Sequence, residues 1–164
     1  MAILTYNQLN IICIEATTSR PWYPPVYNSF LPDLYNTGCR PNELLKKANW
    51  TALSPSEIRL LPSKGNVYRY FNPAVLSTDL VNWITGASQL YDYCTYSKMK
   101  GIWNNNATSK QVFRDSKEMD LYCFRYRYVK GLKLAGHTDA EIQEIMGWNQ
   151  IEMVNSYVNA DLYT

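Results

Sequence analysis

The segment NTGCRPNELL, residues 36–45, places an arginine between a glycine and a short leucine-rich helix. Gly38 suits the end of a preceding helix, and Pro41 suits the first position of the next one, where its missing N–H is not needed. Arg40 therefore lies just before a helix N-terminus, where a guanidinium and first-turn N–H groups can together hold a phosphate. A lone arginine is more often a solvated surface residue, so the rest of the chain has to decide between the two interpretations.

The composition is that of one globular domain. The 164 residues are 46% hydrophobic and 18% charged, which suits a packed core rather than disorder. The net charge of +2 permits a nucleic-acid partner without requiring one, and basic residues gather between Lys110 and Lys133. Four scattered cysteines and a single histidine indicate neither a metal site nor a disulfide framework. Since no apolar run is long enough to span a membrane and no basic leader is present, we expect a cytoplasmic protein.

Hydrophobic spacing and turn residues predict a mainly helical domain with a small antiparallel β-hairpin sheet, an α+β fold. The hairpin is expected from the strand-like runs EIRLL (57–61) and NVYRYF (66–71), with the turn PSKG between them. Gly136 predicts the end of a long helix, and Thr138 with Glu141 predicts a capping box for the next. Helices are expected at 4–16, 26–35, 41–47, 74–87, 95–105, 121–136, 138–148 and 150–160.

Three segments, in order, resemble the active-site boxes of the tyrosine recombinase (phage integrase) catalytic domain. They are TGCRPNELL (37–45), SKGNVYRYF (63–71) and the run from residue 123 to residue 158 that contains the dipeptide Gly147-Trp148. The resemblance covers nearly the whole chain and rests on order and spacing. It implies a tyrosine recombinase catalytic-domain-like fold, with residues 1–164 forming a single catalytic domain and the N-terminal core-binding (clamp) domain absent from this chain.

The resemblance also assigns roles to individual residues. Tyr157, nine residues after Trp148, matches the nucleophile, and Arg40 and Arg125 match the two arginines of the family. Lys64 matches the lysine of the β-hairpin, and Tyr122 stands where the family has a histidine. The implied catalytic residues are thus Arg40, Lys64, Tyr122, Arg125, Trp148 and Tyr157; Glu43 is implied to orient the site, and Arg127 and Lys130 are expected to contact DNA.

These residue types suit DNA strand cleavage without a metal. A tyrosine with a pKa of about 10 is a weak nucleophile at neutral pH, so the phosphate must be made electrophilic. Two arginines can do this by holding the non-bridging oxygens. Lys64 would protonate the departing 5′ oxygen, and the Trp148 indole N–H would donate to the same phosphate. The implied activity is cutting and rejoining of double-stranded DNA through a 3′-phosphotyrosine, for integration, excision or resolution. It uses no cofactor, and the enzyme would act as a homo-oligomer such as a tetramer.

Two alternatives stay open. Residues 135–158 read as two helices joined by a short turn, which is typical of a helix-turn-helix DNA-binding module. The second of these helices begins with Gln150 and carries no basic residue, which disfavours that interpretation. Tyr122 in place of histidine indicates instead a catalytically degenerate recombinase fold that binds DNA or has a structural role.

Overall fold

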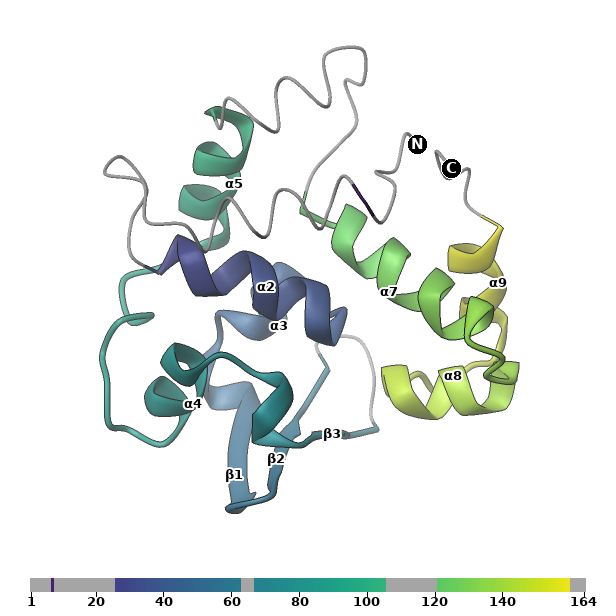
Figure 1. The fold of residues 1–164 in the computed structure, drawn as a ribbon, viewed down its shortest axis with the longest axis horizontal. Coiled ribbons are helices and arrows are strands. Elements are labelled where there is room, and N and C mark those ends of the chain that lie inside the picture. The colour runs from purple at the N-terminus through teal and green to yellow at the C-terminus, as the bar shows by residue number, and fades with distance from the viewer. Residues whose placement is uncertain (1–6, 8–25, 63–66, 106–120, 160–164) are drawn as a thin grey trace.

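The computed structural model describes residue 7 and residues 26–62, 67–105 and 121–159 (Figure 1). The described chain is mainly helical and contains one three-stranded antiparallel sheet, so the predicted α+β fold class is confirmed. Its helices are α2 (Tyr27–Thr37), α3 (Pro41–Leu44), α4 (Thr78–Ile84), α5 (Tyr96–Asn105), α7 (Cys123–Leu134), α8 (Asp139–Met146) and α9 (Glu152–Val158).

The sheet has the strand order β1 (Trp50–Ser54), β2 (Glu57–Leu60) and β3 (Arg69–Phe71). Strands β2 and β3 form the predicted hairpin, with Ile58 opposite Phe71 and Leu60 opposite Arg69. Its turn, residues 63–66, lies outside the described residues. Strand β1 was not predicted. Its sequence, WTALS, lacks the strict alternation of apolar and polar residues that indicates a strand, and only Trp50 of this edge strand is buried.

The predicted helix boundaries are largely confirmed. Gly38 ends α2 with φ 65°, and the Thr138–Glu141 capping box is present in both directions, at 3.0 and 3.2 Å. The helix expected at 74–87 is shorter, because residues 73–75 form a 3₁₀ turn and the Ser77 hydroxyl caps α4 by accepting from the N–H of Leu80. Apart from residue 7, the helix expected at 4–16 lies outside the described part of the chain.

Helix α7 lies between the two halves of the core. On one side it packs against α2, and on the other against α8 and α9 (Figure 1). The larger core cluster joins α2, the sheet, α4 and α5, whereas the smaller one joins α7, α8 and α9 and includes Trp148 and Tyr157. No helix among the described residues has the length and apolar character to cross a membrane. The site residues therefore meet where α7 joins the two clusters.

Candidate active site

Arg40 is the N-cap residue of α3, in the position predicted from Pro41. Its backbone N–H donates to Glu43 Oε1 at 2.8 Å, and its Nη1 donates to Glu43 Oε2 at 3.1 Å. One carboxylate therefore fixes both the main chain and the guanidinium of this residue. Arg40 is only 9% exposed, so it is not the solvated surface arginine of the simpler interpretation.

Glu43 lies between two guanidinium groups. Its Oε1 is 3.6 Å from Arg125 Nη1, in addition to the ion pair with Arg40, and its side chain is fully buried. A buried carboxylate is stable only with positive partners and hydrogen-bond donors, and here two arginines supply them. Glu43 thus holds the two arginines next to each other; its orienting role in catalysis stays a prediction.

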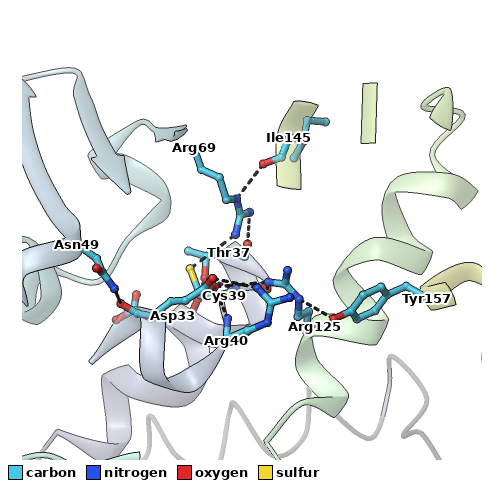
Figure 2. A network of polar contacts seen from close by, with 11 residues as sticks. Asp33, Thr37, Cys39, Arg40, Asn49, Arg69, Arg125, Ile145 and Tyr157 are labelled. Carbon is cyan, nitrogen blue, oxygen red and sulfur yellow. Dashed lines mark hydrogen bonds and ion pairs between the residues drawn. The ribbon is translucent and has the colours of Figure 1, made fainter. Parts of the chain in front are cut away.

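Arg125, on α7, contacts both the Arg40 loop and α9. Its Nη1 donates to the carbonyl of Gly38 at 2.8 Å, and its Nε donates to the Tyr157 hydroxyl at 3.0 Å. Figure 2 shows Arg125 between Arg40 and Tyr157. Burial is the main cause that lowers the pKa of this guanidinium, while the hydroxyl of Tyr157 and the carboxylate of Glu43 favour its charged form. Arg125 therefore ties together three elements that are distant in the sequence.

Tyr157 and Trp148 form a stacked aromatic pair. Their ring centroids are 5.1 Å apart at an interplanar angle of 23°, and Tyr126 packs against Tyr157 at 4.6 Å. The guanidinium carbon of Arg125 lies 5.4 Å from the ring centroid of Tyr157 and 5.5 Å from that of Trp148. Tyr157 and Trp148, to which the resemblance assigned roles, thus lie in one cluster with Arg125.

Two hydrogen-bond donors of this cluster have no partner among the described residues. They are Nη2 of Arg125 and Nε1 of Trp148, and both atoms are buried. An unsatisfied buried donor destabilises a fold by about 1–3 kcal/mol, and more when it is charged. Native proteins satisfy nearly all such groups, so two orphans in one cluster suit an acceptor that the described residues do not supply, such as a phosphate oxygen.

Gly147 brings the Trp148 loop against the hairpin. It has φ 68°, and an added Cβ would lie 2.7 Å from the carbonyl oxygen of Val67 and 2.8 Å from Cγ of Arg69. Only glycine satisfies both the left-handed conformation and this close approach. The backbone conformation and the close packing therefore require glycine at position 147, independently of any role of the predicted Gly-Trp pair.

Arg69 is a buried residue of this region that sequence reasoning missed. Its side chain is 1% exposed and reaches the carbonyl oxygens of Ile145 and Thr37, on two different helices. A period of two along β3 would have placed it inward with Phe71, because the burial pattern there is buried–exposed–buried. An alternation over three residues is a weak signal, and the charge of Arg69 favours an exposed position when only the sequence is considered.

The remaining predicted site residues have other contacts or lie outside the described residues. Lys64 belongs to the undescribed turn. Tyr122 is the N-cap residue of α7, one turn before Arg125, and its ring meets that of Tyr96 edge to face at 6.4 Å. The Nζ of Lys130 donates to the carbonyl of Val158 at 3.3 Å, which ties α7 to the end of α9.

Arg127, which was expected to contact DNA, is a buried residue of α7. It is only 4% exposed and borders a depression between α2 and α7, together with Tyr35 and Tyr128. Helix α2 packs against α7 beside this side chain. A contact with DNA remains a prediction that this burial disfavours.

The described residues contain no group of three or more His, Cys, Asp and Glu side chains that could hold a metal ion. His137 lies just after α7, with its Nδ1 3.5 Å from Glu141 at the start of α8. Its side chain is 37% exposed.

Comparison with solved structures identifies the class of fold. The chain aligns with the XerA recombinase (TM-score 0.61, 18% identity, 97% of this chain and 60% of the other). It aligns with the XerH site-specific recombinase bound to its palindromic difH substrate in a post-cleavage complex (TM-score 0.64, 16% identity, 98% of this chain and 50% of the other). It also aligns with the Tn1549 transposon integrase in complex with transposon right-end DNA (TM-score 0.59, 15% identity, 99% of this chain and 62% of the other).

The chain therefore has the fold of the tyrosine recombinase catalytic domain. At 15–18% identity the likeness concerns the fold, and the chain spans between half and about three fifths of the length of these structures. No protein-family profile matches the sequence, and no curated protein does.

Proposed function

We propose that this chain is the catalytic domain of a tyrosine recombinase, which cuts and rejoins DNA strands through a 3′-phosphotyrosine. The observation that carries the proposal is the hydrogen bond of 3.0 Å from Arg125 Nε to the Tyr157 hydroxyl. It pairs the residue predicted as the nucleophile with the residue predicted to hold the phosphate. A core tyrosine would need neither a buried arginine at its hydroxyl nor two unsatisfied donors nearby.

The geometry of arginine explains why this pairing suits phosphoryl transfer. The Nε–H and one Nη2–H of a guanidinium form a fork that matches two oxygens of a phosphate. In Arg125 the hydroxyl of Tyr157 lies at Nε, and Nη2 has no partner among the described residues. A phosphate oxygen bound at Nη2 would lie beside the phenolic oxygen, so the nucleophile and the phosphorus would be held near each other.

The reaction would then proceed in two transesterifications. The Tyr157 oxygen attacks phosphorus while its phenolic proton passes to water. The bond to the 5′ oxygen breaks, and Lys64 supplies the proton that the departing 5′ oxygen takes up. Arg40 and Arg125 neutralise the charge that develops on the non-bridging oxygens, with Trp148 donating its indole N–H. Attack by a 5′-hydroxyl on the phosphotyrosine reverses these changes and releases the tyrosine, so no cofactor is consumed.

Double-stranded DNA is the proposed partner. Two of the similar structures contain DNA, one of them after cleavage, and the two arginines, with the orphan donors on Arg125 and Trp148, suit a phosphodiester. We propose that the chain acts as a homo-oligomer, such as a tetramer, on two duplexes in integration, excision or resolution. With a net charge of only +2, binding by this chain alone should be weak and should fall steeply as salt is raised.

Covalent trapping tests the proposal. The protein is incubated with nicked duplex DNA, quenched with SDS and examined for a protein–DNA adduct. The adduct should form with the unaltered chain and with Tyr163→Phe, and should be lost with Tyr157→Phe. An adduct that persists in Tyr157→Phe would contradict the assignment of the nucleophile.

One observation favours a second candidate, a catalytically degenerate recombinase fold that binds DNA. Tyr122 occupies the position where the family has a histidine, and a phenol is a weak acid–base group at pH 7. In that case the folded protein would bind DNA without forming an adduct, and Tyr122→His would restore adduct formation. An adduct formed by the unaltered chain would exclude this candidate.

A further inference from the structure

Arg69 is buried within strand β3, and no role follows for it from the sequence motifs. The strand alternates, so that Arg69 and Phe71 face inward while Tyr70 is 55% exposed. The guanidinium carbon of Arg69 lies 4.7 Å from the ring centroid of Phe71 and 5.9 Å from that of Tyr128. An arginine is rarely fully buried unless it is paired, so its partners indicate what it does.

Two of its partners are backbone carbonyls at the C-terminal ends of two helices, and its Nη1 also donates to Cys39 Sγ at 3.8 Å. Nε donates to the carbonyl oxygen of Ile145 in the last turn of α8, at 2.8 Å, and Nη2 donates to that of Thr37, the last residue of α2. Figure 2 shows Arg69 between these two residues. Helix C-termini carry unsatisfied carbonyls and partial negative charge, so one guanidinium stabilises both ends.

Each of these carbonyls stands three residues before a residue of the candidate active site. Thr37 precedes Arg40, and Ile145 precedes Trp148. Beyond Ile145 the chain turns at Gly147, whose Cα lies so close to Arg69 that an added Cβ would be 2.8 Å from its Cγ. Arg69 is therefore the contact through which the loop carrying Arg40 and the loop carrying Trp148 meet.

We propose that Arg69 is a positioning residue that sets the distance between Arg40 and Trp148 and so shapes the phosphate site. It acts through the two backbone carbonyls and does not touch the reacting atoms. The fork of donors is required, because a lysine offers its three N–H groups from a single nitrogen and cannot span two carbonyls in the same way. This inference rests on the proposed function.

The test compares Arg69→Lys with a control on the neighbouring strand, Arg59→Lys. Arg59 is half-buried, and its guanidinium carbon lies 4.1 Å from the ring centroid of exposed Tyr68. Single-turnover adduct formation on nicked duplex DNA at saturating concentration gives a rate constant and an amplitude. If Arg69→Lys does not fold, Arg69→Met, which keeps the length of the side chain without its charge, replaces it.

Arg69→Lys should lower the rate constant at least about tenfold and keep most of the amplitude, because a displacement of about 1 Å at a catalytic group can cost up to about 10²-fold. Arg59→Lys should leave the rate constant unchanged. If Arg69 had a purely structural role, its replacement would reduce the amplitude, which reports the folded fraction, and would leave the rate constant unchanged. An unchanged rate constant in folded Arg69→Lys would overturn the proposal.

A second readout separates this proposal from the proposed function. In protein labelled with 5-fluorotryptophan, the ¹⁹F resonance of Trp148, assigned with Trp148→Phe, reports its surroundings without DNA. Arg69→Lys should shift that resonance and leave the resonance of Trp83, which lies on α4, in place. If the unaltered chain forms no adduct, the proposed function fails, and an unmoved Trp148 resonance then overturns the role of Arg69 as well.

Discussion

Replacing Glu43 with glutamine should destabilise the protein strongly although the two side chains have nearly the same shape. Glu43 is fully buried and lies 3.1 Å from Arg40 Nη1 and 3.6 Å from Arg125 Nη1. Removing one partner of a buried ion pair costs about 3–5 kcal/mol, because the other charge stays buried and unpaired. Glutamine keeps an oxygen for the Arg40 N–H, so we expect the lower end of that range, about 3 kcal/mol.

Thermal unfolding followed by circular dichroism measures this change. For a chain of this length about 1 kcal/mol corresponds to about 2–4 °C, so Glu43→Gln should lower Tm by about 6–12 °C. The control is Asp139→Asn, which breaks the shorter ion pair to Lys133 at 2.7 Å, where the two side chains are 38% and 42% exposed. That exposed pair should contribute less than about 1 kcal/mol. Equal shifts for the two variants would refute the reasoning from burial.

Three further predictions concern backbone fit, pH and the indole. Gly147→Ala should destabilise the protein by at least about 2 kcal/mol more than Gly136→Ala in urea unfolding. Both glycines have positive φ, but only at Gly147 would a Cβ meet the carbonyl oxygen of Val67, at 2.7 Å; equal losses would contradict this contact. Burial raises the pKa of the Asp33 carboxyl from 3.8 to about 6, so the folded state binds the proton more tightly than the unfolded state. Stability should therefore fall by up to about 3 kcal/mol as pH rises from about 4 to about 6 and then level off, and Asp33→Asn should abolish this slope; a slope that persists would count against Asp33 as its source. Trp148→Phe should change the unfolding free energy by no more than about 1 kcal/mol, since lost ring volume and removal of an unsatisfied donor offset each other. It should nevertheless slow adduct formation about 10²-fold on nicked DNA, and an unchanged rate would show that the indole N–H plays no part.

Local signals in the sequence were sufficient for much of the fold. Gly38, Pro41 and the Thr138–Glu141 capping box act through the backbone within a few residues, so the helix ends that they predict are where the structure has them. The predicted hairpin strands also pair as expected, because alternation and turn residues are local properties as well. These features depend little on what the rest of the chain does.

The parts that could not be predicted depend on tertiary contacts. Strand β1 pairs with β2 although only Trp50 is buried, so its presence is decided by the neighbouring strand. The burial of Arg69 and Arg127 follows from where the ends of α2 and α8, and the face of α7, come to lie. A charged residue in a sequence is read as exposed until the carbonyls that will receive its hydrogen bonds are known.

The candidate site falls between these two cases. The resemblance to the tyrosine recombinase boxes singled out Arg40, Arg125, Trp148 and Tyr157 as one set, and the structure places them in one neighbourhood. The hydrogen bond from Arg125 to Tyr157 and the two orphan donors depend on how α7 and α9 pack, which spacing alone does not determine. Their catalytic roles remain predictions of the proposed mechanism.

The most direct test of the central claim is peptide mapping of the covalent adduct by mass spectrometry. The protein is reacted with a nicked duplex, quenched with SDS, digested with nuclease and protease, and searched for a tyrosine that carries a 3′-linked nucleotide. The account predicts that this modification is on Tyr157. A folded protein that binds the duplex and carries no such modification, or carries it on another tyrosine, would contradict the account.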